Sequence, residues 1–192
     1  MEKEISISKD EINTLSPYIF NGKITLIESE ADAQIAITSL QKESILGFDT
    51  ETRAAFRKGE SYDVSLLQLA TDTEAYLFRL NKFPLIQELA DILANPEIVK
   101  AGVGLKDDII ALKKLLPFKD SNFIDLADIA KQQNIKNFGL RALTAICLNK
   151  KLSKKSKISN WERQELTPAQ ITYAACDAVV GFQIYVKLCL KK

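Results

Sequence analysis

The chain has 192 residues, of which 46% are hydrophobic and 27% are charged, and its formal net charge is +1. This length and composition are typical of one globular domain, and they exclude an intrinsically disordered chain. The absence of histidine removes the commonest general base and the commonest zinc ligand. Any catalysis must therefore use carboxylates, tyrosine, lysine or thiols.

The first half of the chain predicts alternating helices and strands. Ser8, with Glu11 three residues later, forms a capping box that opens a short helix ending near Pro17. A helix is then predicted over residues 31–40, and strands over residues 23–28, 45–48, 64–70 and 75–78. The last two of these strands are separated by a short polar turn, which predicts a hairpin beside the preceding strand.

The second half is richer in helix. Helices are predicted over residues 85–93, 107–116 and 140–147, and strands over residues 98–103 and 123–124. The final helix is well defined, because Thr167 as N-cap, Pro168 and Gln170 form a capping box with proline at its first position. We expect one mixed α/β domain spanning residues 1–192, with a core over 23–190 and an N-terminal extension over 1–22.

Neither secretion nor a membrane span is indicated. The N-terminus carries acids and no signal-like apolar run, and no later segment reads as the roughly 20 apolar residues of a membrane span. The three cysteines Cys147, Cys176 and Cys189 are odd in number and widely spaced, which indicates buried thiols instead of disulfides or a zinc site. We expect a cytoplasmic, soluble protein.

The first candidate site is the acid pair Asp49 and Glu51, which follows the apolar strand over residues 45–48. Side chains two apart on a strand point to the same face. Two neighbouring carboxylates repel each other and attract hard divalent cations such as Mg²⁺ or Mn²⁺. A solvated turn at the strand end is the alternative interpretation.

The second candidate is the segment GVGLKDD, which leads from a strand into a helix with Asp107 and Asp108 in its first turn. Acids at this position also simply complement the helix dipole. Gly102 and Gly104 match the beginning of a dinucleotide-binding GxGxxG motif, but Asp107 occupies the place of the third glycine. A dinucleotide site is therefore disfavoured.

The third candidate is the segment YAACD in the final helix. Tyr173 and Asp177 are four residues apart, so that they share one helix face. They form either part of a site or a simple surface hydrogen bond between a phenol and a carboxylate.

Taken in order, FDTET, GVGLKDD and SNWERQELTPAQITYAACDA resemble the three motifs of the DEDD (DnaQ-like) exonuclease superfamily in its tyrosine-containing branch. The likeness is to the exonuclease domain of the Werner syndrome type and to the catalytic domain of ribonuclease D. It runs from about Lys23 to Leu190 and includes the connecting segments VSLLQLA and FGLRALTAICLNKKLSKK. The histidine-containing branch is excluded because the chain has no histidine.

The resemblance implies a ribonuclease-H-like fold, with a five-stranded mixed sheet of three antiparallel strands followed by parallel ones, flanked by helices. It implies two divalent cations, Mg²⁺ or Mn²⁺, held by Asp49, Glu51, Asp108 and Asp177. Asp49 would bridge the two ions, Glu51 and Asp177 would complete the ion that binds the attacking water, and Asp108 would act on the second ion. Tyr173 would orient the water, because a phenol with a pKa near 10 is a poor base.

The implied activity is metal-dependent 3′-5′ exonuclease activity on single-stranded 3′ ends of DNA or RNA, releasing nucleoside monophosphates. The candidate nucleic-acid contacts are Arg53, Lys58, Lys154, Lys155, Lys157 and Trp161. The basic residues could approach phosphates, and the lysines among them could equally form a solvated loop. Trp161 could stack on a base, although packing against the core is the favoured interpretation.

Two alternatives remain at this level. One is a catalytically inactive module that binds nucleic acid or protein, which is disfavoured because all four acids and the tyrosine are present. The other is a ribonuclease that acts on structured RNA, which changes the substrate and leaves the site as it is. DNA and RNA are not distinguished here, since selection at the 2′-hydroxyl depends on pocket shape.

Overall fold

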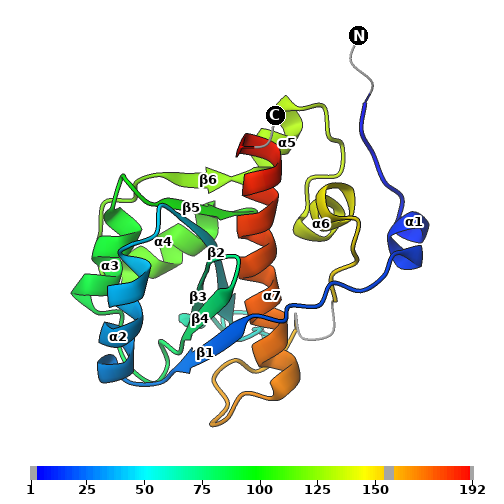
Figure 1. Ribbon diagram of the computed structural model, residues 1–192. Coiled ribbons are helices and arrows are strands. Elements are labelled where there is room, and N and C mark those ends of the chain that lie inside the picture. Colours follow the sequence, from blue (N-terminus) through cyan, green and yellow to red (C-terminus); the bar gives the residue numbers. More distant parts are fainter. Residues whose placement is uncertain (1–3, 154–157, 191–192) are drawn as a thin grey trace.

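The computed structural model describes residues 4–153 and 158–190, which form a mixed sheet with helices on both faces (Figure 1). The strands are β1 (Lys23–Ile27), β2 (Ile45–Thr52), β3 (Val64–Ala70), β4 (Glu74–Phe78), β5 (Val99–Gly102) and β6 (Phe123–Asp125). The α-helices are α1 (Lys9–Thr14), α2 (Glu30–Leu40), α3 (Gln87–Ala94), α4 (Lys106–Leu115), α5 (Leu126–Gln132), α6 (Leu140–Leu148) and α7 (Pro168–Tyr185), which continues into a π-helical turn, η1 (Val186–Leu190).

The strand order in the sheet is β1-β4-β3-β2-β5-β6. Strands β2, β3 and β4 are antiparallel neighbours, whereas β5 and β6 run parallel to β2. The predicted mixed sheet with three antiparallel strands is thus confirmed. The strand count is six instead of five, because β1 pairs in parallel with β4, from Lys23 opposite Glu74 to Ile27 opposite Phe78. This pairing covers the edge that β4 would otherwise expose.

The central strand β3 is buried along its whole length, as expected for a strand covered by helices on both faces. Leu67 and Leu69 pack in the core formed with α2 and α3, whereas Leu66 and Ala70 pack against α7. The period of two along the strand therefore divides its side chains between two separate hydrophobic layers.

Helix α7 crosses the face of the sheet opposite α2, α3 and α4 (Figure 1). It begins with the predicted capping box between Thr167 and Gln170. Its backbone passes so close to β2 that a Cβ atom at Gly47 would lie 1.9 Å from the carbonyl oxygen of Ala178. Only glycine at position 47 permits this approach, which sets the depth at which α7 lies on the sheet.

The expectation that no segment has the length and hydrophobicity of a membrane span was wrong for the last helix. Residues Pro168–Leu190 are long and apolar enough to cross a membrane by composition alone. The reason is their position, because α7 lies between the sheet and α6, and ten of its residues are buried. A helix enclosed by its own domain is apolar around most of its circumference.

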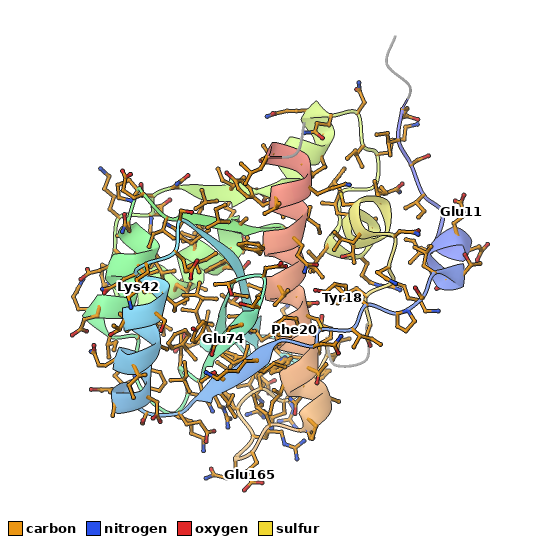
Figure 2. All side chains as sticks on the ribbon, viewed as in Figure 1. Glu11, Tyr18, Phe20, Lys42, Glu74 and Glu165 are labelled. Atoms are coloured by element: carbon orange, nitrogen blue, oxygen red, sulfur yellow. The ribbon has the colours of Figure 1, made fainter. Side chains whose placement is uncertain are left out.

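The segment before β1 packs against the rest of the domain at several points. Isolated bridges join Ile5 to Ile135 and Pro17 to Lys151. Tyr18 and Phe20 lie beside α7, as Figure 2 shows, and pack against its buried residues.

Candidate active site

Strand β2 directs two carboxylates toward α7. Gly47 contacts α7 directly, and residues 47, 49 and 51 share one face because side chains alternate along a strand. Asp49 and Glu51, both half-buried, therefore face the helix at the end of β2. The predicted common orientation of this acid pair follows from the same alternation.

Helix α7 brings Asp177 to the two acids of β2. Asp177 precedes Ala178, whose carbonyl oxygen faces Gly47, and its side chain is buried. One carboxylate oxygen from each of Asp49, Glu51 and Asp177 lies within 4.8 Å of the others. Residues more than 125 positions apart in the chain thus form one cluster of three acids.

Asp108 approaches this region from the other side of β2. It lies in the first turn of α4, and its Oδ1 accepts a hydrogen bond of 2.5 Å from Oγ1 of Thr50, the residue between Asp49 and Glu51. Burial raises the pKa of Asp108, and the Thr50 hydroxyl opposes that rise. Asp108 is therefore attached to the same strand end without belonging to the group of three acids.

Tyr173 lies one turn before Asp177 on α7 and is half-buried. Burial raises the pKa of Tyr173 far above its ordinary value, and the negative charges of Asp177 and Glu51 raise it further. The side chain is therefore a neutral phenol at physiological pH, next to a concentration of negative charge. It can donate or accept a hydrogen bond there, and it cannot act as a phenolate base.

A family model described as 3′-5′ exonuclease matches residues 24–191. The chain belongs to the 3′-5′ exonuclease family. The members of this family are hydrolytic nucleases, which agrees with the enzyme class expected from the three motifs.

Curated relatives and solved structures agree with this exonuclease assignment. The bifunctional 3′-5′ exonuclease/ATP-dependent helicase WRN of Mus musculus is 30% identical over 97% of the chain and 14% of its own length. A putative 3′-5′ exonuclease, R431, of Acanthamoeba polyphaga mimivirus is 31% identical over 91% of the chain and 50% of its own length. The chain therefore spans half or less of either relative.

Two solved structures show the same ribonuclease-H-like fold. The EXO domain of Aedes aegypti Nibbler superposes with a TM-score of 0.80 at 25% identity, covering 90% of both chains. Escherichia coli RNase D, an exoribonuclease involved in structured RNA processing, superposes with a TM-score of 0.80 at 19% identity, covering 88% of this chain and 44% of its own. The expected likeness to the Werner type is confirmed by sequence, and the likeness to ribonuclease D is confirmed for the fold.

The proposed stacking role of Trp161 is wrong for this exonuclease domain. Its side chain is fully buried and packs in the layer between α7 and the sheet, with its ring centroid 6.3 Å from that of Tyr173. A ring without exposed surface cannot receive a nucleobase. The favoured alternative, packing against the core, is what the structure shows.

The basic candidates differ in their surroundings. Nη1 of Arg53 lies 3.0 Å from Oε2 of Glu162, and its guanidinium lies 4.5 Å from the centroid of the Tyr62 ring. Lys58 is exposed in the same loop, between β2 and β3. Three further predicted contacts lie outside the described residues, namely Lys154, Lys155 and Lys157.

An open pocket of about 600 Å³ lies between the loop after β2 and the segment before α7. Its lining includes Arg53, Arg57 and Tyr62, and two exposed apolar side chains, Phe56 at 81% and Ile158 at 71% exposure. The sequence interpretation missed Phe56. The available signal was an aromatic residue next to basic residues in a loop, AFRKGES.

Two polar residues around Asp49 were also missed. Thr50 holds Asp108, as described above. Gln68 pairs opposite Asp49 in the β2–β3 ladder and is fully buried. A polar residue in the middle of the apolar run VSLLQLA was the available signal, because a buried amide needs a structural or functional reason.

Proposed function

We propose that this chain removes nucleotides from the 3′ end of a DNA or RNA strand by two-metal-ion hydrolysis, releasing nucleoside monophosphates. The observation that carries the proposal is the convergence of Asp49, Glu51 and Asp177, whose carboxylate oxygens lie within 4.8 Å of one another. Asp108 is attached to the same strand end through Thr50. This set of four acids is the one that the family resemblance implies.

The three clustered acids fit divalent cations. Like charges at this separation repel, and each carboxylate is half-buried or buried, which strengthens their mutual repulsion because less water screens it. Mg²⁺ and Mn²⁺ prefer oxygen ligands and are commonly bound by a few carboxylates together with substrate phosphates. Such cations would neutralise the negative charges of the cluster and remove the repulsion among the carboxylates.

Bound divalent cations supply a nucleophilic water at neutral pH and stabilise charge on the phosphate and on the leaving oxygen. Asp49, Glu51 and Asp177 would hold such cations, and Thr50 holds Asp108 beside them. Tyr173 stays neutral and orients the attacking water by hydrogen bonding, because it shares a helix face with Asp177.

A nucleic-acid strand as substrate is supported by the family and by the surface beside the acids. RNase D of Trypanosoma brucei has been solved in a complex with RNA U12. In the present chain, the pocket that begins two residues after Glu51 combines the arginines Arg53 and Arg57 with the exposed ring of Phe56. The arginine side chains can bind the phosphates of a strand, and the exposed Phe56 ring can stack on a base.

The test is a time course on 5′-labelled single-stranded DNA, single-stranded RNA and recessed duplexes, with Mg²⁺, Mn²⁺ or a chelator. We expect stepwise shortening from the 3′ end that requires metal and is lost in Asp49→Ala. Asp91→Ala is the matched control, because it removes an exposed carboxylate on α3. If the wild-type protein binds strands without metal and cleaves none of them, the proposed nuclease activity is wrong and the chain is an inactive binding module.

A further inference from the structure

Helix α4, which carries Asp108, has no cap of its own. The residue at its N-cap position is Leu105, which makes no side-chain capping hydrogen bond. Gly104 before it has a φ of +77°, in the left-handed region that favours glycine. The first N–H groups of a helix have no partner within the helix, so that this helix start depends on acceptors from elsewhere in the chain.

Asp125, at the end of β6, supplies those acceptors. Its Oδ1 and Oδ2 each accept from the N–H of Gly104 at 3.1 Å, and its Oδ2 accepts from the N–H of Leu105 at 3.3 Å. Its Oδ1 also accepts from the N–H of Ala127 at 2.9 Å, which caps α5. One carboxylate therefore joins the beginnings of two helices.

The sheet places Asp125 where both helices begin. Strand β6 pairs in parallel with β5, and Asp125 lies opposite Gly102, two residues before Gly104. The end of β5 is fixed in turn against β2, because a Cβ atom at Gly102 would lie 2.4 Å from the carbonyl oxygen of Phe48. Asp125 and the first turn of α4 are therefore both positioned, through β5, relative to β2, the strand that carries Asp49.

The first turn of α4 determines where the Asp108 carboxylate lies. Asp108 follows Leu105 by three residues, and within the described part of the chain its carboxylate is held from another element by the Thr50 hydroxyl on β2. Successive residues of a helix are about 100° apart around its axis, so that a small rotation or fraying of this turn would move Asp108 away from Thr50 and from the three clustered acids.

We propose that Asp125 is a positioning residue, which fixes the first turn of α4 so that Asp108 faces the acid cluster of Asp49, Glu51 and Asp177. The inference rests on the proposed function in its assignment of Asp108 to the metal site. Two oxygens are needed for this task. Three N–H groups from separate positions converge on the carboxylate, and a charged acceptor forms stronger hydrogen bonds than a neutral one.

Asp125→Asn separates the two duties of the side chain. Asparagine caps a helix about as well as aspartate, so that its one carbonyl oxygen, in the place of Oδ1, can keep the bonds to Ala127 and Gly104. Its amide NH₂ would replace Oδ2 and meet the N–H of Leu105, donor against donor. The substitution therefore loosens α4 while it leaves α5 capped. Asp128→Ala is the matched control, because Asp128 is an exposed acid in the first turn of α5 that pairs only with Lys131 among the described contacts.

Three measurements decide the proposal: amide hydrogen exchange at Gly104 and Leu105, Mn²⁺ affinity by calorimetry, and kcat and KM on a 5′-labelled single strand. In Asp125→Asn we expect faster exchange at Leu105, whose N–H contacts only Oδ2 of Asp125, and losses of roughly 10- to 100-fold in Mn²⁺ affinity and in kcat with unchanged KM. Asp128→Ala should match the wild type in all three. The melting temperature of each variant confirms that the fold is retained.

Unchanged exchange at Leu105 in Asp125→Asn would overturn the proposal. So would faster exchange accompanied by wild-type Mn²⁺ affinity and kcat. If the wild type neither binds Mn²⁺ nor cleaves any strand, the proposed function fails by itself. The exchange at Leu105 still decides in that case whether Asp125 holds the beginning of α4.

Discussion

Oγ1 of Thr50 donates a hydrogen bond of 2.5 Å to Oδ1 of Asp108 and so joins the middle of the first acidic motif to the second. Thr50 lies between Asp49 and Glu51, and its side chain points to the opposite face of β2. One strand end therefore presents two acids to α7 and, through Thr50, holds a third acid from α4.

Thr50→Val should lower kcat about tenfold, because it keeps the shape of the side chain and removes the hydroxyl that holds Asp108. The loss of one hydrogen bond should change the free energy of unfolding by only about 1 kcal/mol. Kinetics on a labelled strand and urea unfolding measure the two effects. Thr52→Val, at the exposed end of the same strand, is the control and should behave as the wild type. Equal activities of both variants would show that Asp108 needs no support from Thr50.

Tyr173→Phe should reduce kcat by about 100-fold while leaving KM unchanged, since a positioned acid or base is commonly worth 10²- to 10⁴-fold and the proposed role of Tyr173, orienting the water, belongs at the lower end of that range. The ring would still pack beside Trp161, so the melting temperature should be retained. Steady-state kinetics with thermal unfolding separate the two contributions. Wild-type kcat in this variant would remove Tyr173 from the site.

Trp161→Ala should destabilise the domain by about 3 to 5 kcal/mol, because it empties a large volume in the layer beneath α7. Trp161→Phe should cost less and should bind single strands with the affinity of the wild type. Urea unfolding and fluorescence anisotropy with a labelled strand in the presence of a chelator are the measurements. A folded Trp161→Phe variant that binds strands much more weakly would restore a direct contact for this residue.

Phe56→Ala should weaken binding of single strands by roughly 5- to 150-fold, because base stacking on an exposed ring is worth about 1 to 3 kcal/mol. Its stability should not change, since 81% of the side chain is exposed. Ile35→Ala is the matched control, because Ile35 is 72% exposed on α2 and lies outside the pocket. If both variants bind equally well, the ring of Phe56 does not contact the strand.

Lys100 should make the stability of the domain depend on pH. Its side chain is fully buried on β5, where Nζ donates to the carbonyl oxygens of Asn95 at 2.8 Å and Ile98 at 2.7 Å. Burial lowers the pKa of Lys100 to about 8, whereas in the unfolded chain it is about 10.4. Below pH 8 both states carry the proton, and the full cost of burying the charge is present.

As the pH rises from about 8 to 10.4, the folded state loses this proton before the unfolded state does, and the cost is relieved. The stability of the wild type relative to Lys100→Met should therefore increase over this interval, by up to roughly 3 kcal/mol. Urea unfolding of both proteins at pH 7.5 and pH 10 measures the difference. A difference that is the same at both pH values would contradict the lowered pKa.

The sequence by itself determined what depends on local spacing. The alternation along β2 placed Asp49 and Glu51 on one face, and the four-residue interval placed Tyr173 and Asp177 on one side of α7. The capping box at Thr167 located the beginning of that helix. The three motifs together indicated the exonuclease family, because their residue types and order carry the chemistry that the family requires.

The tertiary structure decided which of these faces meet. Gly47 allows α7 to approach β2 closely enough to add Asp177 to the acid pair, and the pairing of β5 with β6 brings Asp125 to the beginning of α4. Trp161 lies buried in the core, and Arg53 forms an ion pair with Glu162. Periodicity fixes the direction of a side chain within its own element, whereas its neighbours depend on strand order and on the distance between packed layers, which only the folded chain sets.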